Sequence, residues 1–244
     1  MWFIQPKQDY IAQIPWKHTD ESAVMSWQIR ARNYNTFVSD LSLIPMVGIS
    51  LAGAFLFSSF FGDSLFFTLS VGAGMSVLFI LIAMSMTHDT TILVYRFTET
   101  HAEVFFWKPQ MDTVKPFLKW SAIILMPIVV VLILMDPSLI ITSLGPLAMG
   151  LAAWMMGSSK GYQEMARGSR HEEIDWTKTE QIKVWRKRSI IALTYQWKPF
   201  SKNSSYRPQT HLIYCHAEEL EERIKFFKKH LPDAEYEEGK VDIL

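Results

Sequence analysis

The stretch YRFTETHAEVFFWKP, residues 95–109, predicts a β-hairpin placed between two long apolar regions. Apolar residues alternate with others on both sides of its polar turn: Leu93, Tyr95 and Phe97 before it, Val104 and Phe106 after it. A period of two is typical of a strand with one buried face. Because a lone hairpin has nothing against which to bury that face, we expect further strands elsewhere in the chain to pack with it.

Basic residues avoid two long windows on either side of this hairpin. The chain has 244 residues, with 24 Lys and Arg, 24 Asp and Glu, and zero formal net charge. No Lys or Arg occurs in residues 33–95 or 120–159. Since a helix needs about 20 apolar residues to cross ~30 Å of hydrocarbon, each window has the length for two spans. The sequence therefore predicts a membrane α-helical protein with four transmembrane helices arranged as two hairpins.

The predicted spans are 41–61 and 65–86, separated by FGDS, and 117–135 and 139–156, separated by MDPS. Each connector holds one aspartate and no base. The alternative, four buried helices of a soluble protein, fits poorly because such helices are usually shorter and carry some charge. No ionisable residue lies in the span interiors, which disfavours a pump or an ion-coupled carrier.

The distribution of basic residues predicts an orientation. The N-terminal segment, the middle loop and the C-terminal region carry 4, 4 and 16 Lys and Arg, and the two connectors carry none. Short basic loops stay on the cytoplasmic side. We therefore expect a multi-pass protein of the bacterial inner membrane with both termini in the cytoplasm. The N-terminal sequence does not have the basic start and continuous apolar core that are typical of a signal peptide.

The predicted division of the chain follows from these spans. Apolar residues at helical spacing predict an amphipathic helix in the N-terminal segment: Val24, Trp27, Ala31, Tyr34, Val38 and Leu41. In order, we expect an N-terminal segment 1–40, transmembrane hairpin 41–86, β-hairpin loop 87–116, transmembrane hairpin 117–156, linker 157–175, α+β domain 176–231 and acidic tail 232–244.

The C-terminal region predicts the strands that the hairpin lacks. EQIKVWR, SIIALTYQW and THLIYC read as strands, and EELEERIKFFKKHLP reads as a helix with one apolar face. We expect the hairpin 90–109 and the strands of 176–216 to form one small α+β cytoplasmic domain covered by the helix 217–231. The alternative is a hairpin lying on the membrane, with Phe105, Phe106 and Trp107 in the interface.

The region from Trp176 onward resembles the bacterial PH-like integral membrane proteins. The resemblance rests on IDWTKTEQIKVW, SIIALTY, THLIYC and the final helix, and on the tryptophan Trp176 shortly before the strand that begins near Ile182. It implies a small sheet capped by one C-terminal helix, preceded by apolar spans. It implies no catalytic residues, since such domains resemble binding and assembly modules.

The sequence contains no motif that predicts an enzyme, a cofactor or a metal site. The seven histidines include no HExxH pair, and there is no GxSxG motif and no phosphate-binding glycine loop. On a strand, His211 and Cys215 of HLIYCH share one face while His216 points to the other, a poor geometry for a metal. The single cysteine excludes an intrachain disulfide.

The densest basic cluster, WRKRS at residues 185–189, is the best candidate for a binding surface. Basic residues beside a membrane attract anionic headgroups, although a solvated turn explains the cluster equally well. The predicted lipid or partner contacts are Arg186, Lys187, Arg188, Trp107 and Trp27. The acid-rich C-terminal region lacks the broad basic field of a nucleic-acid-binding protein.

These observations favour a non-enzymatic scaffold or regulatory protein. Its cytoplasmic domain is expected to bind a protein partner or the membrane surface, with membrane lipids as partners and with homo-oligomers allowed. Two alternatives stay open at this point. One is an immunity or entry-exclusion protein of a mobile element, and the other is a transporter or channel subunit.

Overall fold

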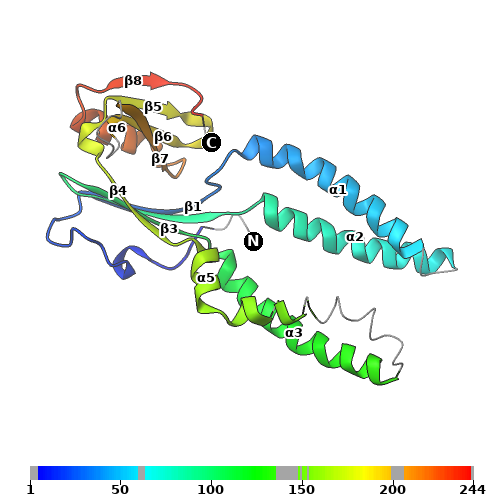
Figure 1. The fold of residues 1–244 in the computed structure, drawn as a ribbon. Coiled ribbons are helices and arrows are strands. Elements are labelled where there is room, and N and C mark those ends of the chain that lie inside the picture. Colours follow the sequence, from blue (N-terminus) through cyan, green and yellow to red (C-terminus); the bar gives the residue numbers. More distant parts are fainter. Residues whose placement is uncertain are drawn as a thin grey trace.

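The computed structural model describes residues 5–59, 64–135, 148, 150–152, 154–198 and 206–242. It is a mixed α+β fold with two four-stranded sheets and a set of projecting helices (Figure 1). Sheet A has the order β1 (Met25–Ala31), β2 (Thr91–Phe97), β3 (Ala102–Trp107) and β4 (Arg170–Ile174), all antiparallel. Sheet B has the order β7 (Arg207–Tyr214), β6 (Ile190–Trp197), β5 (Gln181–Trp185) and β8 (Glu235–Glu238), with β8 parallel to β5. The helices are α1 (Thr36–Ser59), α2 (Leu65–Thr87), α3 (Gln110–Met135), α5 (Lys160–Arg167) and α6 (Leu220–His230).

The predicted β-hairpin is confirmed. Strands β2 and β3 pair in antiparallel register, with Leu93 opposite Phe106 and Tyr95 opposite Val104. Each pair therefore points to one side of the sheet, which we call the inner face of sheet A. In the polar turn, the amide of Thr98 donates to the carbonyl oxygen of His101 at 2.8 Å.

The inner face of sheet A packs against sheet B and α6. Residues of both sheets and of α6 form one apolar cluster. Edge strand β7 meets this face through its backbone: the Trp27 indole donates to the Tyr214 carbonyl at 2.9 Å, and the Tyr95 hydroxyl donates to the Leu212 carbonyl at 3.2 Å. These bonds occupy backbone groups that an open edge would leave for another chain. The hairpin and the C-terminal strands thus share a core while lying in separate sheets.

The opposite side of sheet A, its outer face, is covered by the N-terminal segment, residues 5–24 (Figure 1). Ile92, Val94 and Trp107 point to this side and pack with residues of the segment. The Tyr10 ring meets the Trp107 ring edge-on, with centroids 4.9 Å apart. Sheet A is therefore buried on both faces.

The predicted amphipathic helix is wrong over residues 25–31, where the structure has strand β1. Met25, Trp27 and Ile29 are buried there, and the residues between them are half-buried. The sequence fits both a period of two and a helical period over this stretch. Pairing with β2 decides between them, because it satisfies the backbone of both strands.

Two further segments are more ordered than predicted. The linker 157–175 contains α5 and strand β4, whose sequence RHEEI has too few apolar residues to be recognised as a strand. The acidic tail contains β8, which lies parallel to β5. Both strands lie at sheet edges, where polar residues face solvent.

The prediction of four transmembrane helices is contradicted. Within the described residues, one helix is long and apolar enough to cross a membrane, from Thr36 to Leu56 in α1. In α2, the structure describes a shorter apolar helix, Thr68–Met84. Residues 61–63 of the FGDS connector and most of the predicted span 139–156 lie outside the described residues. The multi-pass topology and the inner-membrane localisation derived from it are therefore not supported.

The physical reason is that an absence of charge does not by itself place a helix in lipid, because uncharged helices also pack on one another. Helix α2 packs closely against α1 at Gly72. Gly72 lies where a Cβ atom would come 2.7 Å from the Phe55 ring, and the Ser58 hydroxyl donates to the Thr68 carbonyl at 3.1 Å. Glycine and hydroxyl groups allow such close contact.

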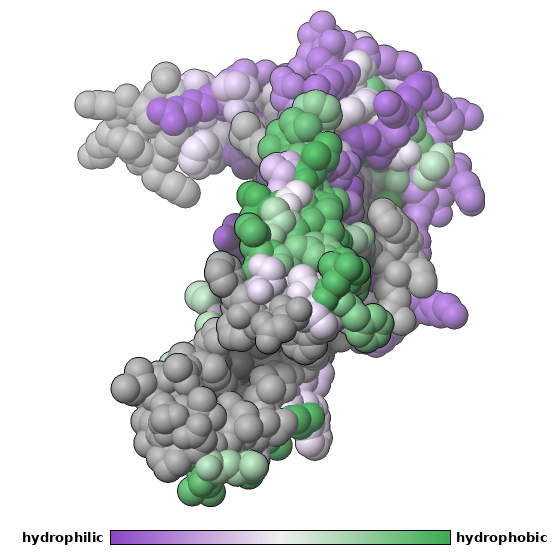
Figure 2. All heavy atoms as spheres, turned by 90° about the vertical axis from the view of Figure 1, so that its right-hand side faces the viewer, coloured by the Kyte–Doolittle hydropathy of each residue, from purple (hydrophilic) through white to green (hydrophobic). Residues whose placement is uncertain are grey.

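The projecting helices nevertheless carry large exposed apolar side chains. In α1, Phe37 is 74% exposed and Ile49 is 73% exposed, and Phe66 of α2 is 81% exposed. Figure 2 shows apolar residues gathered on these helices and hydrophilic residues gathered over the sheets. A contiguous apolar surface of this kind marks a contact with lipid or with another apolar surface.

Candidate functional site at the start of α1

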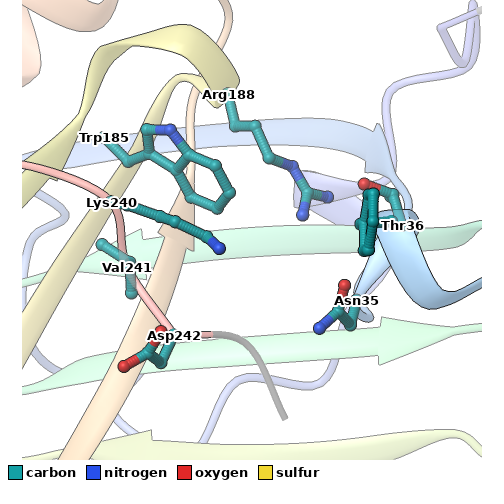
Figure 3. Close-up of a pocket in the computed structure, with 8 residues that line it drawn as sticks. Asn35, Thr36, Trp185, Arg188, Lys240, Val241 and Asp242 are labelled. Carbon is teal, nitrogen blue, oxygen red and sulfur yellow. The ribbon is translucent and has the colours of Figure 1, made fainter.

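A small pocket lies where α1 leaves the two-sheet part of the molecule. Its walls come from the start of α1, the turn after β5 and the C-terminal segment: Asn35, Thr36, Phe37, Trp185, Arg188, Lys240, Val241 and Asp242. Figure 3 shows Lys240 and Arg188 directed into the space between Trp185 and the first residues of α1. The pocket volume of about 100 Å³ is well below the ~300–1,000 Å³ of sites that enclose a whole small molecule.

Arg188 connects sheet B to the segment that enters α1. Its Nη2 donates to the Arg32 carbonyl at 3.0 Å, and its guanidinium lies 5.4 Å from the centre of the Trp185 ring. Ser189 follows in the left-handed region at φ 52° and closes the tight turn between β5 and β6. The basic cluster that the sequence singled out is therefore a turn held against the base of α1.

The first turn of α1 and the last turn of α2 are joined by hydrogen bonds to one carbonyl oxygen. The Thr87 carbonyl accepts from the Tyr34 hydroxyl at 2.8 Å, from Arg32 Nη2 at 3.3 Å and from the hydroxyl of Ser39. Arg32 also forms an ion pair with Asp40. Burial lowers the pKa of the guanidinium, but Asp40 and Tyr34 together outweigh it, so the pKa is raised. The pocket is thus built on a rigid support.

The pocket is rich in groups that bind anions. Lys240 contributes an ammonium group, and among the described residues it has no ion-pair partner. Asn35 accepts from the Val38 amide at 3.3 Å and so caps α1, whose first amides and positive dipole end face the same region. Asp242 on the rim limits the positive charge. The set suits one phosphate or carboxylate group.

Arg186 lies in the same turn but is occupied elsewhere. Its side chain pairs with Glu238 on β8 at 2.8 Å and with Glu221 on α6. These carboxylates raise the pKa of Arg186, and Arg186 in turn lowers the pKa of Glu238 to about 2. The side chain therefore joins β8 and α6 to the turn. Lys187 is exposed, and no partner for it is found in the described part of the chain.

The two tryptophans predicted as contacts are buried. Trp27 is 5% exposed on the inner face of sheet A, under the guanidinium of Arg223 at 4.8 Å. Trp107 is 4% exposed on the outer face beneath the N-terminal segment. Both indoles belong to the core, so neither offers a surface to lipid or to a partner.

The sequence motif HLIYCH does not converge on a common point. His211 stacks on Tyr195, and His216 contacts the carbonyl of Gln28 at 2.9 Å. Cys215 is buried, and its burial raises the pKa of the thiol to about 12. The thiol is protonated at neutral pH and is a poor nucleophile.

Sequence reasoning missed Lys240, Asn35 and Trp185 as pocket residues. Trp185 stands directly before the basic cluster, which is a usable signal. Lys240 lies in the predicted acidic tail 232–244, and its place depends on the parallel pairing of β8 with β5. No local pattern predicts that pairing.

Comparison with known proteins gives no further guide. No protein-family model, no curated protein and no solved structure matches the chain. The resemblance to bacterial PH-like proteins stays a prediction.

Proposed function

We propose that the protein is a non-enzymatic binding module held at a membrane surface, with α1 as the segment that enters lipid. The pocket at the start of α1 receives the anionic headgroup of a neighbouring lipid. One observation carries the proposal: the pocket lies at the N-terminal end of the helix in the described chain that is long and apolar enough to cross a membrane.

Position and chemistry both support a headgroup as the ligand. A helix that starts to enter hydrocarbon at Thr36 places that residue at the level of the headgroups. Lys240 and Lys187 then lie beside anionic lipid, whose surface attracts each basic residue by about 1 kcal/mol. The pocket volume fits a phosphate rather than a larger molecule.

The first experiment measures lipid retention by native mass spectrometry. The full chain is purified in detergent and mixed with equal amounts of phosphatidylglycerol and phosphatidylcholine. We expect preferential retention of phosphatidylglycerol, and we expect the preference to fall several-fold in a variant with Lys240→Ala and Lys187→Ala, because both cations are removed.

Lys229→Ala is the matched control. Lys229 is exposed in the last turn of α6. From α6 the chain runs to Glu235, which pairs with Gln181 at the start of β5. The pocket residue Trp185 is at the other end of β5, so α6 ends on the side away from the pocket. This variant is expected to keep the preference. Equal retention of the two lipids by the unaltered chain, or a preference that the double variant keeps, would contradict the proposal.

The second experiment tests α1. Ile49→Lys places a charge near the middle of the apolar segment, which costs roughly 2.5–3.5 kcal/mol of insertion free energy. We expect less protein to stay with the membrane fraction after an alkaline wash. Val24→Lys, at an exposed position outside α1, is the control and is expected to change nothing.

A further inference from the structure

A cluster of two histidines and two glutamates lies at the end of sheet A opposite to α1. We call it the His–Glu cluster; it comprises His18, Glu21, His101 and Glu173. The residues come from the N-terminal segment, from the turn between β2 and β3, and from β4. Strand β1 separates the cluster from the pocket, since it begins opposite Phe97 and ends at Ala31, shortly before α1.

The distances within the cluster match those between ligands of one metal ion. His18, Glu21 and His101 each offer one ligand atom within 4.8 Å of the other two. Oε1 of Glu21 lies 3.0 Å from Nδ1 of His101. A tetrahedral ion with bonds of about 2.0–2.1 Å requires ligand atoms ~3.3 Å apart. Small side-chain shifts therefore suffice to close the site around an ion.

Glu173 approaches the same imidazoles from their other nitrogens. Its Oε1 lies 3.2 Å from Nε2 of His18 and 3.9 Å from Nε2 of His101. At the shorter distance, a carboxylate that accepts the Nε2 proton of His18 keeps the lone pair of the neutral ring on Nδ1, the arrangement that commonly accompanies metal-binding histidines. The Nδ1 atom of His101 faces Glu21, on the side where the ion would bind.

The two imidazole rings are stacked, with centroids 4.0 Å apart and planes 7° apart. A neutral ring is the form that binds a metal. The side chains of His18, Glu21 and His101 are 25%, 29% and 34% exposed, so an ion can reach them from solvent.

The backbone that carries His18 and Glu21 is fixed by a buried ion pair on the outer face of sheet A. The Glu103 carboxylate, 1% exposed, accepts from the Lys17 amide at 2.9 Å and from the His18 amide at 3.1 Å. Arg96 donates to the carbonyls of His18 and Glu21. Two ligands from the N-terminal segment are thereby held against His101 before any ion binds.

We propose that His18, Glu21 and His101 bind one divalent ion of the zinc class, with Glu173 orienting the His18 imidazole. Two imidazole nitrogens and a carboxylate oxygen suit Zn²⁺ better than Ca²⁺ or Mg²⁺, which prefer oxygen alone. Three protein ligands leave one position for water. The bound ion joins the N-terminal segment to the hairpin turn.

The test is titration of the metal-free full chain in detergent with two ions. Binding of Zn²⁺ is measured by calorimetry, and binding of Co²⁺ is measured by its visible absorption. We expect one Zn²⁺ per chain and a tetrahedral Co²⁺ spectrum. His18→Asn and His101→Asn are each expected to weaken Zn²⁺ binding at least about tenfold and to change the Co²⁺ spectrum. Glu173→Gln is expected to weaken binding while leaving the spectrum unchanged, since it removes no ligand.

His230→Asn is the matched control, because His230 is an exposed histidine at the end of α6. It is expected to bind Zn²⁺ as the unaltered chain does. Circular dichroism of each metal-free variant shows whether the fold is kept, and Glu21→Gln provides a further ligand change that keeps side-chain shape. No Zn²⁺ binding by the unaltered chain, or equal binding by folded His18→Asn and His101→Asn variants, would overturn the proposal.

Discussion

The two faces of sheet A are both buried but by different means. The inner face is covered by aromatic rings and by β7 and α6, whereas the outer face is covered by an N-terminal segment that lies partly on a buried ion pair. Apolar burial involves no ionisable group, while the strength of a carboxylate network depends on pH and on salt. We therefore expect the inner face to contribute most of the free energy of unfolding, and the position of the N-terminal segment on the outer face to depend on pH.

The largest effect is expected from Phe97→Ala on the inner face. Phe97 is fully buried, with ring centroids 5.5 Å from Trp27 and 5.4 Å from Phe227. Removing such a ring costs about 3–5 kcal/mol of unfolding free energy through lost transfer energy and a cavity. Denaturant unfolding of the full chain in detergent, followed by tryptophan fluorescence, measures the loss.

Phe105→Ala sharpens this comparison, because Phe105 is a half-buried ring on the outer face of the neighbouring strand. The loss of unfolding free energy for Phe105→Ala is expected to be clearly smaller than the loss for Phe97→Ala. Equal losses for the two rings would show that the outer face contributes as much to the fold as the inner face does.

The next effect in size is expected from Glu103→Gln. Glutamine keeps the shape of the side chain but removes the charge that faces Arg96 and His171. Hydrogen bonds to a buried charge are worth about 1.5–3 kcal/mol, so we expect a loss of about 2–3 kcal/mol. Hydrogen exchange is expected to rise mainly in the N-terminal segment, whose amides at Lys17 and His18 bind this carboxylate.

The control is Glu99→Gln, since Glu99 is an exposed carboxylate in the turn of the same hairpin. This variant is expected to change hydrogen exchange and the free energy of unfolding only slightly. If Glu103→Gln speeds exchange equally in β5 and β6, the ion pair supports the whole fold rather than the outer cover alone.

The same contrast explains what the sequence could predict. The inner face follows from alternation in one short stretch, and the strands β5, β6 and β7 and helix α6 follow from similar local patterns. Strand β1 fits two periods, and β4 has too few apolar residues to be recognised. The His–Glu cluster joins His18, His101 and Glu173, which are far apart in the sequence, so no spacing rule reveals it. The transmembrane prediction equated missing charge with lipid contact, although Gly72 of α2 packs closely against Phe55 of α1.

A smaller effect is expected from Tyr95→Phe, again on the inner face. The Tyr95 hydroxyl donates to the Leu212 carbonyl and accepts from the Tyr214 amide, both at 3.2 Å. Phenylalanine fills the same volume, so the cost is that of two unpaired groups at the β7 edge, about 1–2 kcal/mol. Denaturant unfolding measures this loss of free energy, and faster hydrogen exchange of the Tyr214 amide would show that it arises at the β7 edge. A loss as large as that of Phe97→Ala would mean that the polar contacts, and not the rings, hold the two sheets together.

The smallest effect is expected from mild acid, and it is expected first on the outer face, because the acid-sensitive pair of sheet B, Arg186 with Glu238, lies at the exposed β8 edge. Burial raises the pKa of Glu103, but the amides of Lys17 and His18 and the ion pair with His171 outweigh it, so the pKa is lowered from 4.5. Hydrogen bonds from Thr98 and Thr100 lower the pKa of Glu21 to about 2. A carboxyl group with a lowered pKa stabilises the folded state above its unfolded pKa, and this contribution is lost as pH falls through the folded value. Hydrogen exchange in the N-terminal segment should therefore be constant, after correction for intrinsic rates, from pH 7 to about 5 and should rise between about pH 4.5 and 2. Strands β6 and β7 of sheet B are expected to stay protected over the upper part of that range, and opening of these strands and of the N-terminal segment at the same pH would remove the distinction between the two faces.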